Sequence, residues 1–580
     1  MLKRITKFIV SFFLILGIVF VTLYFYVKGH KQEVVNFIVN TISEKHNGSI
    51  NFDDVTLKVW GNFTNPAFYV KNIVLLDSSD SKSNRFEAED VYLNLSIKQL
   101  LKKEIQVKSI RIENANFNSI TYKEDLAALL AKKDSLPEKE LISDVFKEYK
   151  MSLIIEDFSF DIQNIPRHKR FKFNIEEISS KILVGSDQIS STLNLNAHIT
   201  QLGFNIEKGS FLKDSKIKGT LHPFIDLTNK KIHIPSFDLS INDQIFKLTT
   251  DFDISKQSSF LFHIENEKTA YAPTLKLISE HIQLKLNEYS VKQEFSTITT
   301  IQGRFKPFAN PLIHIKFNTE GNSALINERF DLDSLSFNGS FTNRIYNDDR
   351  AKTEDKKDIK LIFNSMTGKY KETKFELSNG ILLSTPEDKG QIKGYIKANG
   401  LPENLFSLKD DPIFTFKNGH FNLIGNFEGD ATSFSDLLSL STITLNFENT
   451  ELNSTKDNIS IPVSQLNFNI NEDRAEFEVL KFPVNSSNDL NIQGEISHFS
   501  SLLTKDAEIS AKTNLHIKSI KLIWEDFVNF FKVNHKKTKF QIKKPADVIT
   551  DLAREVYLKF DPIITIDIKE FETSLNGCNC

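Results

Sequence analysis

Apolar and polar residues alternate along most of this chain, over short runs that end at Asn, Asp, Ser or Gly. In one such run the apolar residues fall on alternate positions, at Val91, Leu93, Leu95 and Ile97, with Tyr92, Asn94 and Ser96 between them. Successive side chains of a strand point to opposite faces, so this pattern indicates a strand with one apolar face and one polar face. A helix would instead repeat its apolar residues every three to four positions.

The same spacing recurs in eight further segments, which we predict to be strands. They carry Phe158, Phe160 and Ile162; Phe171, Phe173 and Ile175; Leu193, Leu195, Ala197 and Ile199; Phe237, Leu239 and Ile241; Phe260, Phe262 and Ile264; Ile313, Ile315 and Phe317; Ile443, Leu445 and Phe447; and Leu466, Phe468 and Ile470. Strands that are apolar on one side favour antiparallel pairing. The sequence therefore predicts a mainly β, mostly antiparallel fold of on the order of 30 strands.

An uncharged apolar run from Phe8 to Val27 precedes the strands. A helix over this run would be about 30 Å long, which matches the hydrocarbon thickness of a bilayer. We therefore predict a single transmembrane anchor. Its apolar residues include Phe8, Phe12, Phe13, Leu14, Leu16, Ile18, Phe20, Leu23 and Val27.

A cleaved signal peptide is the alternative interpretation of this run, because Lys3, Arg4 and Lys7 precede it. A signal h-region is only about 7 to 15 residues long, however, and no small-x-small cleavage pattern follows here. Only slightly more basic residues precede the run than follow it, so they indicate its orientation weakly. A short cytoplasmic stub with the bulk of the chain exported is nevertheless the favoured topology.

Helices are predicted in only a few places. The segment 31–46 carries an apolar stripe typical of an amphipathic helix, and other candidates are 126–133, 141–150, 274–286, 524–531 and 546–557. Polar stretches at 132–140 and 343–360 indicate loops. Three segments, 93–112, 425–452 and 494–522, each pass from a strand through a Leu-Leu step into another strand, which indicates a loose internal repeat.

Composition excludes several classes of protein. With 72 basic and 75 acidic residues the net charge is −3, so nothing indicates binding to nucleic acid. The two cysteines, Cys578 and Cys580, cannot form a disulfide framework, so apolar burial and strand pairing must stabilise the fold. Phenylalanine is abundant, at 50 of 580 residues, and its placement on the alternating faces is what carries information.

No motif for catalysis is recognisable. The sequence has no HExxH, nucleotide-binding glycine loop or GxSxG, and its 13 histidines are scattered. Asp251 with Asp253, and Asp331 with Asp333, have the spacing that places two carboxylates on one strand face. Either pair could hold calcium or act as an acid and base, but two solvated carboxylates are the simpler interpretation. We predict no enzyme activity, no cofactor and no metal.

At the N-terminus a basic stub, an apolar span and an amphipathic segment lead into 47–52 (NGSINF), 55–60, 66–76 (PAFYVKNIVLL), 86–101 and 105–117 (IQVKSIRIENANF). This order of elements resembles that of the AsmA-like family of envelope proteins. The resemblance covers about residues 1–130. The middle of the chain, with 208–211 (KGSF) and 218–224, is similar to the longer members from Bacteroidota-type bacteria.

The resemblance implies a long, curled sheet whose concave side is an apolar groove for lipid. Members of the family are anchored in the inner membrane, project into the periplasm and are implicated in phospholipid transport that supports outer-membrane biogenesis. The corresponding division here is 1–30, stub and anchor; 31–150, AsmA-like N-terminal region; 151–424, central repeating groove; and 425–580, C-terminal groove segment. The expected partners are membrane phospholipids and an outer-membrane or other envelope protein.

We expect the Phe-rich faces to line the groove. The candidate residues are Phe158, Phe160, Phe171, Phe173, Leu193, Leu195, Phe260, Phe262, Ile315, Phe317, Leu445, Phe447 and Phe468. Two alternatives stay open. The apolar faces could be sealed inside a structural spacer or adhesin, or the strand edges could assist the assembly of outer-membrane proteins.

Overall fold

The computed structural model shows a protein that is mainly β and mostly antiparallel, with few helices. It describes residues 48–58, 67–77, 84–96, 99, 106–122, 149–255, 258–304, 311–328, 330–343, 359–384, 390–406, 414–430, 437, 440–454, 460–483, 489–498, 511–523 and 562–572. None of the helices within these ranges is long and apolar enough to cross a bilayer.

Several predictions from the sequence lie outside the described residues. They are the anchor at 8–27, the helices at 31–46, 126–133, 524–531 and 546–557, and the two cysteines. The predicted helix at 141–150 also falls outside, except for Tyr149 and Lys150, which begin a strand. The prediction of one helix over 274–286 is wrong in part, because two short helices, α5 (Tyr271–Leu275) and α6 (Glu280–Leu286), form there.

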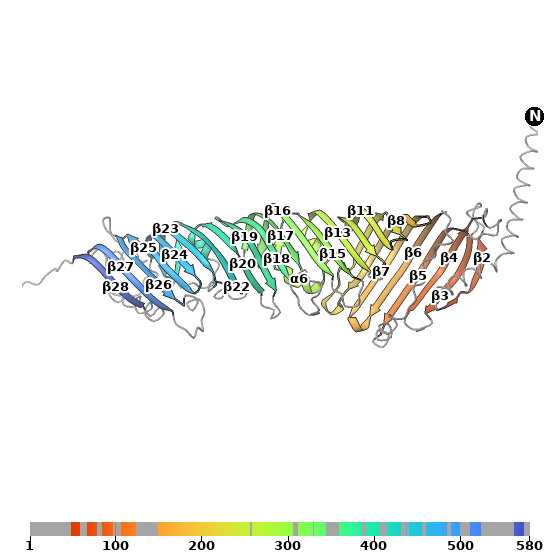
Figure 1. The fold of residues 1–580 in the computed structure, drawn as a ribbon, viewed down its shortest axis with the longest axis horizontal. Helices are drawn as coiled ribbons and strands as arrows, with labels where there is room; N and C mark the ends of the chain where they lie inside the picture. The colour runs from red at the N-terminus through yellow and green to blue at the C-terminus, as the bar shows by residue number, and fades with distance from the viewer. Residues whose placement is uncertain are drawn as a thin grey trace, which may run out of the picture. The chain divides into compact units, whose positions relative to one another are not determined.

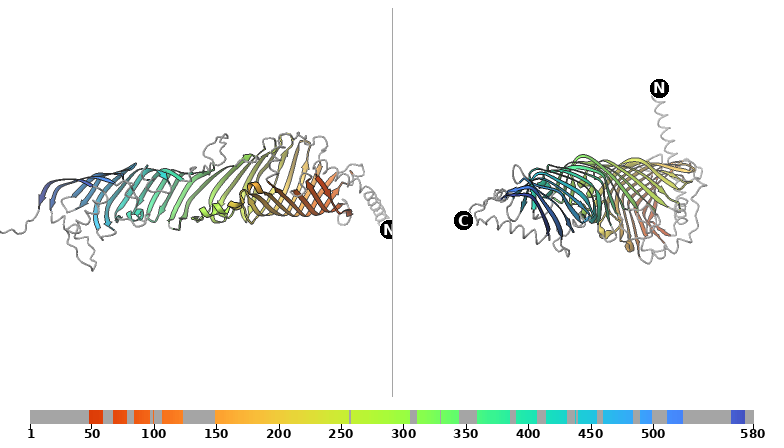
Figure 2. Two further views of the ribbon diagram at one scale, coloured as in Figure 1. Left: turned by 90° about the horizontal axis from the view of Figure 1, so that it is seen from below. Right: turned by 60° about the vertical axis from the view of Figure 1, so that its left-hand side comes forward.

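The chain divides into two compact units. The N-terminal unit comprises Met1–Asn266, Ala272–Asn287 and Thr300–Pro311, and the C-terminal unit comprises Glu267–Tyr271, Glu288–Thr299 and Leu312–Cys580. In each unit the strands lie side by side and form a sheet (Figures 1 and 2).

The N-terminal unit contains β1 to β12. Their bounds are β1 (Gly48–Asn51), β2 (Asp54–Lys58), β3 (Ala67–Asp77), β4 (Asn84–Leu95), β5 (Val107–Thr121), β6 (Tyr149–Asn164), β7 (Lys169–Val184), β8 (Gln188–Gly203), β9 (Ser215–Leu221), β10 (Phe224–Asp226), β11 (Lys231–Ile241) and β12 (Gln244–Asp253). Two 3-10 turns, η1 (Ile165–Arg167) and η2 (Ile206–Lys208), follow β6 and β8. Strands β13 (Ser259–Thr269) and β15 (Phe295–Arg304) have residues in both units.

Among the residues that the structure describes, the C-terminal unit contains β14, β16 to β28 and the short helix α7. Their bounds are β14 (Tyr289–Val291), β16 (Leu312–Ile326), β17 (Phe330–Thr342), β18 (Lys360–Tyr370), β19 (Thr373–Ser384), β20 (Gly390–Gly400), α7 (Pro402–Phe406), β21 (Phe414–Lys417), β22 (His420–Asp430), β23 (Thr442–Ser454), β24 (Ser460–Asn471), β25 (Arg474–Pro483), β26 (Asp489–Ser497), β27 (Lys512–Ile523) and β28 (Pro562–Glu572).

Two of the strand pairs depart from the antiparallel rule. β5 pairs with β6 in parallel, and β27 pairs with β28 in parallel. Adjacent hairpin strands are antiparallel, whereas parallel neighbours need a longer connection. The connection from β5 to β6 is 123–148, and the connection from β27 to β28 is 524–561. Both are long interruptions of the alternating pattern, and both lie outside the described residues.

A line of residues with positive φ crosses the N-terminal unit at one level. Asn72, Asn114 and Asp157, on β3, β5 and β6, have φ values of 50°, 51° and 53°. The register skips these positions, so that Val70 and Ile73, three residues apart on β3, pair with Val91 and Ala88 of β4. The register itself does not shift, because each of these residues faces a skipped residue of the neighbouring strand. We call the three positions bulges in the sense that they shift the alternation by one, so that apolar side chains on both sides of them stay on the same face.

The bulge at Asn114 gives a direct test of this register. Asn and Asp tolerate positive φ, whereas a β-branched residue there is strained. The substitution Asn114→Val is expected to destabilise the fold by about 1–3 kcal/mol. The substitution Asn114→Gly is expected to be neutral or slightly stabilising, because glycine adopts positive φ without strain. Chemical denaturation of the full-length chain measures both.

The matched control is Asn116→Val, two residues further along β5, where the backbone is extended and the side chain is also exposed. Valine favours strands, so this variant is expected to keep or raise stability. Equal destabilisation by Asn114→Val and Asn116→Val would contradict the role of the bulge.

Candidate apolar lipid-binding faces

Continuous rows of apolar side chains cross the strands of the N-terminal unit. Because the strands pair in register, residues opposite one another form rows perpendicular to the strands. From β3 to β8 the four rows are Leu75, Phe86, Phe117, Phe160, Phe173 and Ile199; Ile73, Ala88, Ala115, Phe158, Ile175 and Ala197; Val70, Val91, Ile112, Ile155, Ile178 and Leu195; and Phe68, Leu93, Ile110, Leu153, Ser180 and Leu193. We call this surface the N-terminal apolar face.

Aromatic rings on this face stack along the row. The centroids of Phe117 and Phe160 are 5.2 Å apart and those of Phe160 and Phe173 are 5.3 Å apart, with nearly parallel planes. Phe158 contacts Phe160 edge-on at 6.3 Å. These ring contacts of Phe160 all join neighbours on the same face. The three stacked side chains are only partly buried, so they offer apolar surface to a further molecule.

The opposite face of the same strands is polar. Between the second and third apolar rows it carries a row of charged residues, Asp90, Glu113, Glu156 and Glu177, which pair in register across β4 to β7. Arg111 forms ion pairs with Glu113 and Glu156, the latter with an N–O distance of 2.7 Å. The two faces therefore differ sharply in charge, as is usual for a sheet with one apolar and one solvated face.

Similar rows cross the C-terminal unit from β20 through β22 to β27, and we call their surface the C-terminal apolar face. The three rows are Ile396, Gly425, Ile443, Ile470, Ala475, Ile496 and Thr513; Ala398, Leu423, Leu445, Phe468, Phe477, Gly494 and Leu515; and Gly400, Phe421, Phe447, Leu466, Leu480, Ile492 and Ile517. Two of the rows reach Ile564 and Ile566 of β28, which are 48% and 62% exposed.

Two glycines of the C-terminal unit lie directly beneath aromatic rings. At Gly339 a Cβ atom would lie 2.5 Å from the Phe317 ring, and at Gly394 it would lie 2.9 Å from the Phe427 ring. In both pairs the ring lies across the glycine on the neighbouring strand. The aromatic side chain thus covers the backbone that a glycine would otherwise expose on an apolar surface.

The predicted lining residues fall on these surfaces to different depths. Those that are half-buried on the apolar side of their strands are Phe158, Phe160, Phe171, Phe173, Leu193 and Leu195 on the N-terminal apolar face, Phe260 and Phe262 on β13, Ile315 and Phe317 on β16, and Leu445 and Phe468 on the C-terminal apolar face. Phe447 differs, because it is only 1% exposed and stacks on Phe416 of β21 at 4.5 Å. We therefore count Phe447 as core.

Several residues of the N-terminal apolar face were not predicted as lining. Phe86, Phe117, Ile155 and Ile178 belong to the same rows as the predicted residues. The bulges place Ile155 three positions from Phe158, which breaks the strict alternation used to select candidates. An Asn or Asp between two apolar runs, as at Asp157, is the sequence signal that could have found them.

The paired aspartates have other roles in the structure. Asp251 lies 2.7 Å from Nδ1 of His233, and Asp331 lies 2.9 Å from Nζ of Lys292. Asp253 accepts a hydrogen bond from the backbone N–H of Ser255, and its contacts with Ser255 lower the pKa of its carboxyl. In the part of the chain that the structure describes, no group of three or more His, Cys, Asp or Glu could hold a metal ion.

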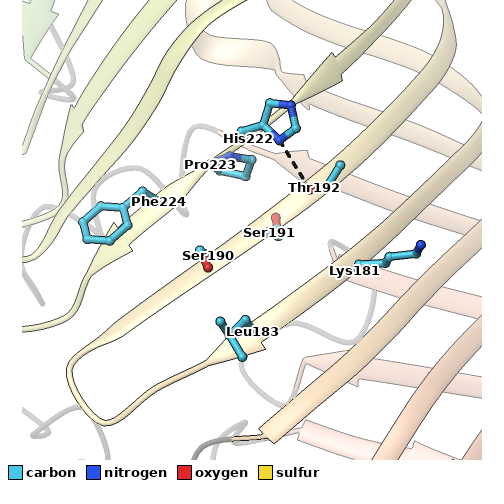
Figure 3. A pocket seen from close by; sticks show the side chains of 8 residues that line it. All are labelled: Lys181, Leu183, Ser190, Ser191, Thr192, His222, Pro223 and Phe224. Atoms are coloured by element: carbon cyan, nitrogen blue, oxygen red, sulfur yellow. Dashed lines mark hydrogen bonds between the residues drawn. The ribbon is translucent and has the colours of Figure 1, made fainter.

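A shallow hollow of about 340 Å³ lies on the polar side of β7 and β8. Its lining is Lys181, Leu183, Ser190, Ser191, Thr192, His222, Pro223 and Phe224 (Figure 3). Thr192 and His222 lie 3.3 Å apart across it. Lys181 and Thr192 alternate along their strands with Ser180 and Leu193 of the apolar face, so the hollow is separate from that face.

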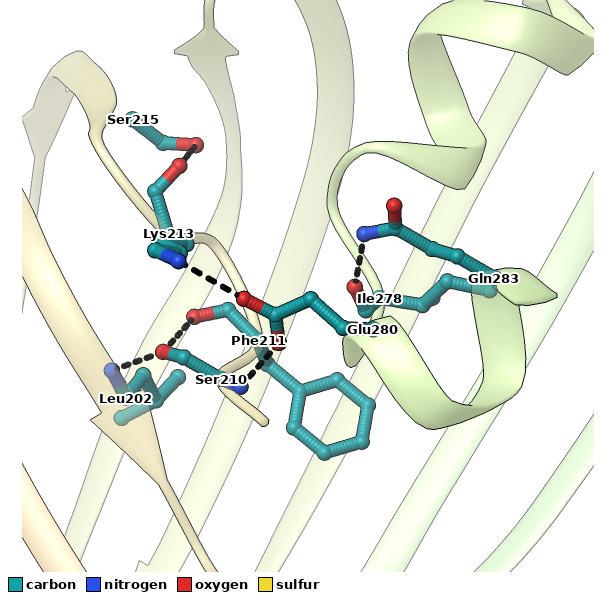
Figure 4. Close-up of polar contacts among 8 residues, drawn as sticks. All are labelled: Leu202, Ser210, Phe211, Lys213, Ser215, Ile278, Glu280 and Gln283. Carbon is teal, nitrogen blue, oxygen red and sulfur yellow. Dashed lines mark hydrogen bonds and ion pairs between the residues drawn. The ribbon is translucent and has the colours of Figure 1, made fainter. Parts of the chain in front are cut away.

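The Glu280 carboxylate joins α6 to the connection between β8 and β9. Glu280 accepts hydrogen bonds from the backbone N–H of Ser210 at 2.7 Å and from Nζ of Lys213 at 2.9 Å (Figure 4). The neighbouring Gly209 has φ 97°, and a Cβ there would collide with the Glu280 carboxylate. Leu277, between the helices, packs with Ile241 and Phe246 at the end of the apolar strands.

Comparisons with family models, curated proteins and solved structures found no match to this chain. Any function assigned to the apolar faces must therefore be argued from their geometry.

The Glu280 contact predicts a pH dependence. The hydrogen bond from Lys213 lowers the pKa of the Glu280 carboxyl. A lowered pKa in the folded state means that the stabilisation is present above the unfolded pKa and is lost as the pH falls through the folded pKa. At neutral pH Glu280→Gln is expected to lower stability by up to about 1 kcal/mol, a small value because the pair is partly exposed.

Thermal denaturation of the full chain between pH 7 and pH 3 measures this difference. The gap between wild type and Glu280→Gln is expected to close as the pH falls. Glu267→Gln, which changes an exposed carboxylate on β13, serves as the control and should show no such gap. A gap that persists unchanged at pH 3 would rule out the carboxylate contact as its cause.

Proposed function

We propose that this chain is a membrane-anchored envelope protein whose apolar faces shelter phospholipid acyl chains and conduct them between the inner and outer membranes. The observation that carries the proposal is the N-terminal apolar face, on which four rows continue across six strands with their large side chains mostly half-buried. A protein core of this size would be expected to bury such side chains fully.

The energetics favour an acyl chain as the guest. Each methylene group that leaves water for an apolar surface gains about 0.8 kcal/mol when fully buried. Hydrocarbon makes no hydrogen bonds, so a face built almost entirely of apolar side chains is the appropriate surface for it. No bond is made or broken in such a process, which agrees with the absence of a catalytic motif in the sequence.

The direction of the rows indicates the path that an acyl chain would follow. Apolar residues are continuous across the strands, whereas along β6 and β7 the rows end at polar residues, with Lys169 opposite Asn164. An acyl chain that stays in contact with the rows would therefore move perpendicular to the strands. The resemblance of the N-terminal order of elements to AsmA-like proteins supports the same function. The spacer and assembly-factor alternatives remain competing hypotheses for the test below.

Site-specific photocrosslinking tests this function. We expect benzoylphenylalanine at Phe173, on the apolar face, to form phospholipid adducts when the full-length chain is irradiated in bacterial cells. At the adjacent Asn174, which lies on the polar face, the adducts should be at least about tenfold fewer, because a charged or polar surface gives no gain for hydrocarbon. Mass spectrometry of the purified chain identifies the adducts.

Three other results would count against the proposal. Adducts of equal yield at both positions would show that the face does not discriminate, and the absence of lipid adducts would favour a structural spacer. Protein adducts at Phe173 without lipid would favour the assembly factor.

A further inference from the structure

One edge of the N-terminal apolar face ends in basic residues. Along β7 the side chains of Phe173, Phe171 and Lys169 alternate onto the same face, since the pairing with β6 is regular over this stretch. Lys169 lies opposite Asn164, at the point where β6 passes into η1. Arg167 ends η1 two residues before Lys169. We call Asn164, Arg167 and Lys169 the basic rim.

Arg167 lies close enough to Lys169 for its charge to act on the Lys169 ammonium. Burial lowers the pKa of the Lys169 ammonium, and repulsion by Arg167 lowers it further. No carboxylate opposes this effect within the described part of the chain. Two cations that are close together and partly desolvated favour the arrival of an anion, which reduces their repulsion.

The nearby carboxylates are engaged by other residues. Asp161 accepts two hydrogen bonds from Arg170, at 3.1 and 2.7 Å, and Glu207 lies 3.1 Å from Nδ1 of His168. These contacts neutralise Arg170 and leave the charge of Lys169 without an acidic neighbour among the described residues.

A second, independent feature marks the same place. The Oδ1 atom of Asn164 is buried and has no hydrogen-bond partner among the described residues. Buried polar atoms are nearly always hydrogen-bonded in folded proteins. The side-chain amide can present either its oxygen or its NH₂ group, so it can serve an anion that also carries a hydroxyl or ammonium donor.

Apolar surface adjoins the basic rim. The ring of Phe171 contacts that of Phe204 at 5.5 Å, and Phe204 contacts Phe211 at 5.9 Å. Phe204 is 51% exposed. Lys169 is two residues beyond Phe171 along β7, which is about 7 Å in a strand. A molecule with a hydrocarbon part on Phe171 and Phe173 could therefore reach Lys169 with a charged end.

We propose that Lys169, Arg167 and Asn164 form a binding site for a phosphate-type anion at the edge of the N-terminal apolar face. The phosphate of a lipid headgroup and free inorganic phosphate share this chemistry, and lysine and arginine bind both. The assignment to a lipid headgroup rests on the proposed function. The site itself does not, because it is defined by the three residues and their charge.

The first experiment separates the headgroup from the acyl chains. The full-length chain with benzoylphenylalanine at Phe173 is irradiated in neutral detergent micelles that contain either phosphatidylglycerol or diacylglycerol with the same acyl chains. Phosphatidylglycerol should be captured about tenfold better, as expected for one or two charge-assisted contacts. The double variant Arg167→Gln/Lys169→Gln should lower its capture to the level of diacylglycerol and leave diacylglycerol unchanged.

Lys172→Gln is the matched control, because Lys172 lies on the same strand but on the polar face. It should leave the capture of both lipids unchanged. Equal capture of the two lipids by the wild type, or a double variant that loses both equally, would overturn the assignment to a lipid headgroup. Absence of capture of either lipid would instead contradict the proposed function and leave the anion site to the second experiment.

The second experiment tests free phosphate on the lipid-free, full-length chain. Inorganic phosphate is titrated while the acylation of Lys169 by an amine reagent is followed by mass spectrometry, with Lys172 as the internal reference. Selective protection of Lys169 supports the anion site, and protection without any headgroup preference in the first experiment assigns its ligand to free phosphate. No protection together with no headgroup preference would overturn the proposal.

Discussion

The structure depends on one constraint, which is that neighbouring strands keep a register that places apolar residues opposite apolar residues. A slip of one residue in any strand would turn its apolar side chains to the polar face. The constraint is strong in the N-terminal unit because Val70 and Ile73, on either side of a bulge, both pair with apolar partners on β4. The bulges at Asn72, Asn114 and Asp157 lie at the same level, so the rows above and below them remain continuous.

The apolar surfaces differ in how much of their area the protein uses for its own packing. Around Phe68 and Val70 the side chains are almost fully buried and form a core with Val55 of β2. Phe447 and Phe421 form a comparable core in the C-terminal unit. Between β5 and β8 the large side chains of the rows are half-buried, except for Ile199, although their chemistry is the same. The same rows thus stabilise the fold at some strands and present apolar surface at others.

Much of this fold could be predicted from alternation alone, because period-two patterns identify strands whose one face is apolar. The strands around Phe160, Phe173 and Leu195 were found in this way. Alternation fails at a bulge, which is why Ile155 and Phe117 were not predicted as lining. It also cannot show that Phe447 is sealed by Phe416, since that contact comes from a strand 31 residues away in sequence. The basic rim was not predicted either, because Lys169 resembles any polar residue at a strand end until its pairing is known.

The line of bulges at Asn72, Asn114 and Asp157 has a consequence for how such a protein can change in evolution. Adding or deleting one residue within a strand would move its bulge out of line with the adjacent bulges and invert half of that strand. Adding a complete antiparallel hairpin beside existing strands would leave the side chains of every neighbouring strand on their present faces. Chains of this architecture are therefore expected to lengthen by duplication of two-strand segments, and related sequences should differ in size by multiples of a hairpin.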